Sequence, residues 1–192
     1  MHLVCARAIA LLLSATLVML PGAAAAGGAV LFKGGAMRLQ DDNQVIDLQP
    51  RSLDDISHGT FAFSWEARKK SGVALGMEFL TYRNDFSPPA AQTGEAKTTV
   101  LQFVGKKYFI DGGAFHPYVG AGIGAGRTNV SYPSFSDEEY TLAMQVVLGF
   151  ELRFDNLSFV LEGKHLYHDI EGGGNEYNPT ATGLFAGMGL NW

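Results

Sequence analysis

The chain has 192 residues, a length that favours a single domain, and 47% of them are hydrophobic while only 17% are charged. Soluble globular proteins usually carry a larger charged share, roughly 25%. The formal net charge is −5 and no basic patch is visible, which argues against nucleic acid as a partner.

The first 26 residues have the organisation of a secretory signal peptide. Arg7 is followed by an apolar run at 8–20, by Pro21-Gly22 and by four alanines at 23–26. A basic start, a short apolar core and a small-residue A-x-A site define such signals, and the run is shorter than the ~20 residues of a spanning helix. We expect export with cleavage after residue 25 or 26, leaving one domain at 27–192. The only cysteine, Cys5, lies in the signal, so the exported chain has no disulfide and no thiol chemistry.

After residue 26, apolar residues alternate with polar or small ones, and this period of two predicts strands rather than helices. Eight segments are candidates: 29–39, 60–68, 73–82, 99–109, 117–127, 141–154, 157–168 and 182–192. In the clearest, 141–154, every even-numbered residue from Leu142 to Phe154 is apolar, and Glu151 and Arg153 belong to the opposite set. Both faces of 29–39 and of 99–109 are mixed, so the pattern does not assign their faces.

The connections between these segments alternate between long and short. The long ones are 40–59, 83–97, 128–139 and 169–181, and the short ones are 69–72, 111–117 and 155–156. Strands joined in this way are antiparallel neighbours in an up-and-down meander. We therefore expect all long loops at one end, and all short turns together with both termini at the other.

The length of the strands favours a membrane barrel. Soluble strands mostly have about 5–6 residues, whereas a tilted strand needs about 9–11 residues to cross a bilayer, as these candidates do. Only helices and closed barrels satisfy the backbone inside lipid, and eight strands enclose just enough space for their own side chains. The sequence predicts an all-β fold, an eight-stranded antiparallel up-and-down transmembrane β-barrel. A soluble lipocalin-like binder is the alternative, because its strands alternate too.

Charged residues of both signs fall on the face that such a barrel turns inward. They are Glu66, Arg68, Glu78, Glu151, Arg153, Glu162 and Lys164, with Lys33 as a further candidate. Buried charges are tolerated when they are paired and hydrogen-bonded. We therefore predict a structural salt-bridge network that plugs the lumen, with an ion path as the alternative. The glycines at 120–126 and 187–189 would leave room for long side chains opposite.

The whole exported chain resembles the small outer-membrane β-barrel family of the OmpA/OmpX-like type. The resemblance rests on the signal peptide, the eight strands, the run HPYVGAGIGAG at 116–126 and the ending GLFAGMGLNW. It implies a Gram-negative cell outer membrane, with lipid and lipopolysaccharide around the barrel and loops free to contact host or surface ligands. It also implies that Leu190 and Trp192 form a C-terminal signal for the outer-membrane assembly machinery.

This fold hosts several functions, so the resemblance alone does not fix one. We expect a non-enzymatic scaffold without catalytic, cofactor-binding or metal-binding residues. One alternative is a conduit for small apolar solutes, as in the OmpW-like branch. Another is a PagL-like lipid A deacylase, which needs a Ser next to its His; the segment 164–179 has His165, His168 and Asp169 but no Ser. The two histidines are three residues apart on a strand and face opposite sides, a poor geometry for a metal.

Overall fold

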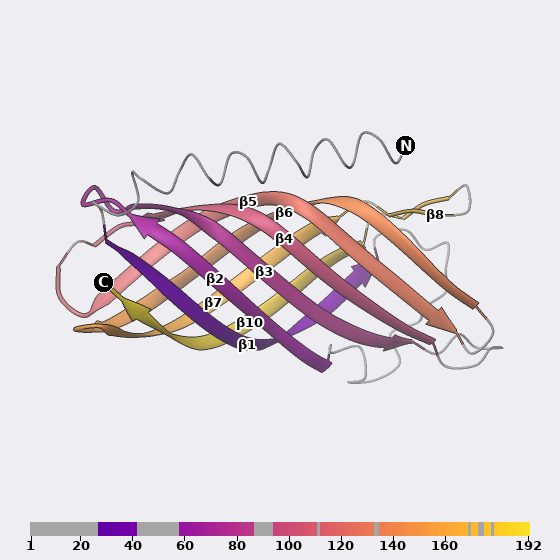
Figure 1. The fold of residues 1–192 in the computed structure, drawn as a ribbon, viewed down its shortest axis with the longest axis horizontal. Helices are drawn as coiled ribbons and strands as arrows, with labels where there is room; N and C mark the ends of the chain where they lie inside the picture. Colours follow the sequence, from indigo (N-terminus) through magenta and orange to yellow (C-terminus); the bar gives the residue numbers. More distant parts are fainter. Residues whose placement is uncertain are drawn as a thin grey trace.

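A computed structural model describes residues 27–41, 58–86, 94–110, 112–132, 135–168, 170–172, 175–177 and 179–192. Eight long strands are present: β1 (Gly28–Asp41), β2 (His58–Arg68), β3 (Val73–Phe86), β4 (Gly94–Tyr108), β5 (Phe115–Tyr132), β6 (Phe135–Phe154), β7 (Leu157–His168) and β10 (Pro179–Asn191). They form a closed barrel in the order β1-β10-β7-β6-β5-β4-β3-β2, with every pair antiparallel (Figure 1). The predicted fold class is confirmed, while the predicted signal peptide at 1–26 lies outside the described residues.

The barrel is closed by its first and last strands. Ala29 of β1 faces Asn191 of β10, and the backbones of Gly28 and Trp192 exchange two hydrogen bonds of 3.0 and 3.1 Å. The connections β2–β3, β4–β5 and β6–β7 lie at this same end, which we call the inner end; the opposite end is the outer end (Figure 1). The described part of the chain contains no helix that is long and apolar enough to cross a membrane.

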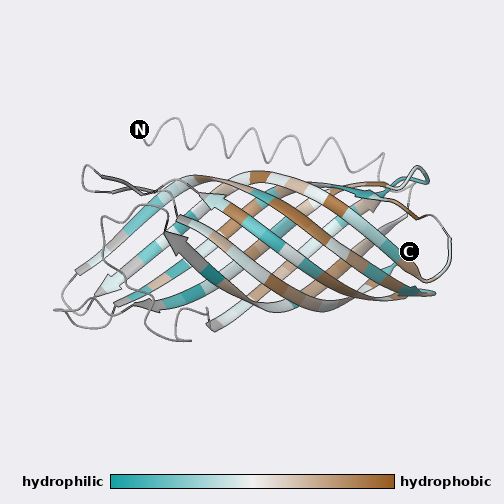
Figure 2. Cartoon of the chain, turned by 180° about the vertical axis from the view of Figure 1, so that it is seen from behind, coloured by the Kyte–Doolittle hydropathy of each residue, from teal (hydrophilic) through white to brown (hydrophobic). Residues whose placement is uncertain are grey.

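The alternation along each strand separates an apolar outside from a filled inside. On β6, Leu148 is 67% exposed and its neighbour Val147 only 1%. Outward-facing leucines, phenylalanines, valines and methionines form a belt around the middle of the barrel, which Figure 2 shows as brown segments with teal ones towards the ends. A belt of this kind, on strands of 11 to 20 residues, is typical of transmembrane barrels.

The structure assigns the faces of the two mixed segments. On β1, Leu31 and Lys33 are buried inside and Phe32 is exposed outside. On β4, Lys106 is buried and Lys107 is exposed. The pattern could not separate these faces because the lumen accepts apolar as well as charged side chains, so each face holds residues of both kinds.

Two predicted long loops contain strand. The connection at 128–139 is mostly an extension of the β5–β6 hairpin, which is paired out to Tyr132 and Phe135. Its polar composition suggested a loop, but an antiparallel hairpin in water needs no apolar face, and Thr, Val and Tyr suit strands. In the last connection, β8 (Ile170–Gly172) and β9 (Asn175–Tyr177) form a small hairpin. The long and short connections therefore do not alternate in every case.

The seam between β1 and β2 is shorter than the others. Pairing of β1 with β2 ends at Gly35 and Thr60, whereas β1 stays paired with β10 as far as Asp41. On the other side of β2, the register with β3 shifts between His58 and Phe61. This bulge contains Gly59, whose φ of 62° is a left-handed value that favours glycine.

Inward-facing glycines let the wall come close to large side chains. A Cβ at Gly187 would lie 2.7 Å from Cγ of Lys33, and one at Gly120 would lie 3.0 Å from Cγ of Lys106. A Cβ at Gly124 would collide with the backbone oxygen of Leu101 on β4. The glycines of β5 and β10 thus make the space that the buried lysines occupy.

We expect Gly124→Ala to lower the free energy of unfolding by about 1–3 kcal/mol, because the added methyl group must displace backbone rather than a flexible side chain. The matched control is Gly34→Ala, since a Cβ at this glycine would meet nothing within 4 Å. Urea unfolding of the purified protein in detergent micelles measures both. Equal effects of the two substitutions would contradict the close approach of β4 and β5.

Candidate functional site

A single chain of ion pairs runs through the lumen. Nine charges alternate in sign along it: Lys164, Glu78, Lys33, Glu162, Lys106, Glu66, Arg68, Glu151 and Arg153. The separations include 2.8 Å for Lys33–Glu162 and 2.9 Å for Arg68–Glu151. With five cations and four carboxylates, this set has one net positive charge at neutral pH. All seven predicted lumen residues, and Lys33, belong to it.

Glu162 on β7 is the central member of this network. It is 0% exposed and lies 2.8, 3.1 and 3.2 Å from the ammonium groups of Lys33, Lys106 and Lys164. The hydroxyl group of Tyr118 also donates to it at 2.6 Å. A carboxylate can accept about four hydrogen bonds, so the acceptor capacity of Glu162 is fully used.

A second group of contacts lies nearer the inner end. Arg68 donates to both oxygens of Glu151, at 3.1 and 2.9 Å, and to Oδ1 of Asn191 at 2.8 Å. The hydroxyl oxygen of Tyr108 lies 2.8 Å from Glu66 and 3.1 Å from Glu151, so its one proton is shared between the two carboxylates. The guanidinium group of Arg153 lies over the Tyr108 ring, 4.7 Å from its centroid. The bidentate Arg68–Glu151 pair has the geometry of the strongest ion pairs in proteins.

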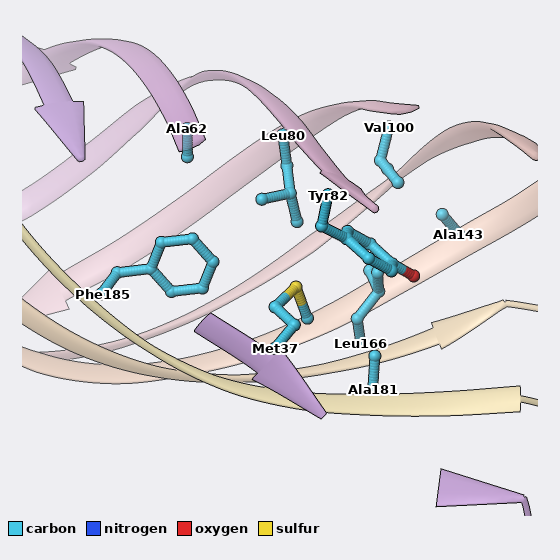
Figure 3. Close-up of a cluster of buried hydrophobic side chains, with 9 residues drawn as sticks. All are labelled: Met37, Ala62, Leu80, Tyr82, Val100, Ala143, Leu166, Ala181 and Phe185. Carbon is cyan, nitrogen blue, oxygen red and sulfur yellow. The ribbon is translucent and has the colours of Figure 1, made fainter. Parts of the chain in front are cut away.

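The outer part of the lumen is largely apolar, with Asn84, Thr98 and Thr128 as buried polar side chains. Its cluster of buried side chains consists of Met37, Ala62, Leu80, Tyr82, Val100, Ala143, Leu166, Ala181 and Phe185. Figure 3 shows Met37 of β1, Leu80 and Tyr82 of β3, and Phe185 of β10 directed towards one another. Phe185 joins this apolar cluster to the charges, because the ammonium group of Lys164 lies 5.4 Å from its ring centroid. The charge network therefore occupies the inner part of the lumen, and this apolar cluster lies next to it on the side of the outer end.

Every barrel strand supplies a side chain to this filling. Examples from the eight strands are Lys33, Glu66, Glu78, Lys106, Tyr118, Glu151, Glu162 and Asn191. The paired charges and the apolar cluster occupy the inside of the barrel over most of its length. Such an arrangement can hold the wall in one shape and keep ions from crossing, because a mobile ion would have to displace a fixed partner.

Sequence reasoning missed several polar members of the site, among them Lys106, Tyr108, Tyr118 and Gln145. Lys106 escaped because Lys106 and Lys107 are adjacent, so either face of β4 receives one lysine. Tyr108 and Gln145 are uncharged, and a charge count does not detect them, although Gln145 donates to Glu78 at 3.0 Å. Charge balance gave no signal for Lys106 either, because Arg68, Arg153, Lys164 and the candidate Lys33 already matched the four inward carboxylates in number.

His165 and the C-terminal residues lie on the outside. Nδ1 of His165 is 2.7 Å from the hydroxyl oxygen of Thr182, its direct cross-strand neighbour. The side chain of His168 and the whole of Asp169 lie outside the described residues. Leu190 and Trp192 are 61% and 59% exposed on the outer wall. Among the described residues, no group of three or more His, Cys, Asp or Glu could hold a metal ion.

Solved structures of small outer-membrane barrels have a similar fold. Neisserial surface protein A is 15% identical with a TM-score of 0.64, and the match covers 86% of this chain and 97% of that one. Ail of Yersinia pestis is 16% identical with a TM-score of 0.57, over 87% and 99%. OprG of Pseudomonas aeruginosa is 12% identical with a TM-score of 0.52, over 87% and 96%. No family model and no curated protein matches the chain.

These likenesses show the fold, that of a small eight-stranded β-barrel. Outer-membrane barrels with this architecture differ in function, so the fold by itself does not decide what this chain does. The choice between scaffold, conduit and enzyme therefore rests on the residues inside and around this particular barrel.

We expect Glu162→Gln to destabilise the barrel by about 3–5 kcal/mol, because it leaves buried ammonium groups without their shared carboxylate. Glu95→Gln, which breaks a largely exposed pair with Arg83, should cost less than about 1 kcal/mol. The double substitution Glu162→Gln with Lys106→Met should recover part of the loss, since both partners are removed. Urea titration in micelles tests all three, and an additive double variant would argue against the pairing.

Proposed function

We propose that the chain is a non-enzymatic scaffold of the Gram-negative outer membrane, exported by residues 1–26 and plugged by its own side chains. The observation that carries this proposal is the unbroken alternation of nine charges inside the barrel, continued by the apolar cluster. A lumen filled with paired charges and packed apolar side chains serves stability and shape. A catalytic or conducting lumen would need a free nucleophile or a continuous water path.

The apolar side chains on the outside of the barrel support the proposal that the protein lies in a membrane. Leu142, Val146 and Leu148 are at least half exposed on the outer wall, and water would have to cover this belt in a soluble protein. Burying apolar surface gains roughly 25 cal/mol per Å², so such a belt favours lipid strongly. Phe109, Phe115 and Trp192 are exposed near the inner end, where aromatic residues suit the membrane interface.

The outer end is the part of this scaffold that would meet other molecules. The β5–β6 hairpin is paired beyond its neighbours, and there Arg127 is ion-paired with Glu138 and lies 5.9 Å from the Tyr140 ring. Ail, a protein of similar fold, has been solved with the heparin analogue sucrose octasulfate. We propose that the outer connections here serve surface interaction, with host or surface ligands as partners.

The inner end would serve assembly. Leu190, on the last strand, and Trp192, directly after it, are both exposed on the outside of the barrel, where another protein can reach them during insertion. We propose that they are read by the outer-membrane assembly machinery and then contact lipid.

A conduit for small apolar solutes is the second candidate, and the β1–β2 seam favours it. The pairing of these strands stops at Gly35 and Thr60, next to the apolar part of the lumen that contains Met37 and Ala62. A solute entering there would have to displace the cluster. We rank this function second because the described side chains already fill that space.

We expect the full-length protein to fractionate with the outer membrane and to migrate differently in SDS gels before and after boiling, because closed barrels resist SDS until heated. Purified protein in planar bilayers should show no sustained conductance steps, because the lumen is filled with paired charges. Recovery in the soluble periplasmic fraction would exclude the scaffold in the membrane. Stable conductance would contradict the closed lumen and indicate a pore.

The conduit makes a different prediction in liposomes. If it exists, the protein accelerates entry of a small apolar fluorescent dye, and Met37→Trp, which adds bulk beside the seam, abolishes the acceleration. We expect no acceleration by the unaltered protein. Leu148→Trp, on the outer wall away from the lumen, is the matched control.

A further inference from the structure

A hollow of about 340 Å³ lies at the outer edge of the apolar belt, over strands β2, β3 and β4. Its lining consists of Gly59, Phe61, Thr81, Tyr82, Arg83 and Lys97. The bulge in β2 produces it, because two residues of β2 there oppose Tyr82 alone and the wall bends. A Cβ at Gly59 would meet nothing within 4 Å, so the bulge leaves open space.

Two cations face each other across this hollow. Arg83 and Lys97 are direct cross-strand partners on the outward face of β3 and β4. Like charges directly opposite on an antiparallel pair are destabilising unless an anion lies between them. Arg83 has an exposed partner, Glu95, at 3.1 Å, and no described carboxylate lies within ion-pair distance of Lys97. Among the described side chains, Lys97 is therefore the cation at this hollow without an ion-pair partner.

The rest of the lining suits a lipid rather than a dissolved ion. Along β4 the outward residues change from Leu101 through Thr99 to Lys97, so the cations begin one step beyond the belt. Phe61, 50% exposed, offers an apolar surface on the belt side of the hollow. Thr81 is buried although it faces outward, and its hydroxyl group is held by the backbone oxygen of Thr98 at 3.1 Å. Acyl chains could follow the belt while a headgroup meets the cations.

We propose that this hollow binds the phosphate group of an outer-leaflet lipid, of the kind that lipid A of lipopolysaccharide carries. Arg83 would leave Glu95 and engage the phosphate through two nitrogens, and Lys97 would add a second charge. The exposed Arg83–Glu95 pair costs little to open, because such pairs contribute little in water. The inference rests on the membrane placement proposed above and deepens it, since it gives the barrel one lipid-selective side.

The test uses the purified protein in phosphatidylcholine nanodiscs, titrated with bisphosphorylated lipid A or with lipid A stripped of its phosphates. We expect tight binding of the first and at least tenfold weaker binding of the second. The double variant Arg83→Gln with Lys97→Gln should bind bisphosphorylated lipid A roughly thirtyfold more weakly. The matched control, Lys69→Gln with Lys107→Gln, removes two exposed lysines at the inner end and should bind within about twofold of the unaltered protein.

Several results would overturn the site. They are unchanged binding by the double variant, equal loss in the control, equal binding of dephosphorylated lipid A, and competition by inorganic phosphate at the concentration of the lipid. Should the double variant fail to fold, Lys97→Gln and Arg83→Lys replace it, and both must still weaken binding. Comparison of boiled and unboiled samples in SDS gels distinguishes failure of the lipid site from failure of the membrane placement. If the double variant shifts on boiling and still binds lipid A normally, only the lipid site is contradicted. If the unaltered protein does not shift on boiling, the membrane placement is contradicted.

Discussion

The structure depends on one constraint, that each barrel strand finds a hydrogen-bonding neighbour on both sides through the middle of the barrel. The exchange between Gly28 and Trp192 completes the ring, and with it the sheet loses its free edges in that region. Closure at eight strands fixes a narrow interior. The interior then has to be filled, and the glycines of β5 and β10 and the long lysines opposite them are the solution this sequence has reached.

The filling divides into two parts with different physics. The inner part is held by charges that satisfy one another, and its energy depends strongly on each partner being present. The outer part is held by shape, through Met37, Phe185 and their neighbours, and tolerates exchange among side chains of similar volume. The contact between Lys164 and Phe185 marks the boundary between the charged part and the apolar part of the lumen.

The sequence was sufficient for the fold and for most of the charged residues, because a period of two over ten or more residues leaves few architectures open. Glu66, Glu151 and Glu162 could be placed on the inner face from alternation alone. Lys106 could not, since its neighbour Lys107 makes the two faces of β4 equivalent in charge. The bulge at Gly59 was also beyond reach, because a lone glycine before a strand is equally consistent with an ordinary loop end.

The alternating network also limits how this protein can change over evolutionary time. Glu162 has three cationic neighbours, so a substitution that removes its carboxylate leaves all three short of a partner. Lineages would have to alter such positions in coordinated sets, passing through poorly stable intermediates. Residues on the outside of the barrel do not depend on one another in this way. Leu148, for example, can be exchanged for valine or phenylalanine without a second substitution. Related sequences should therefore show correlated substitution inside the barrel and independent drift outside it.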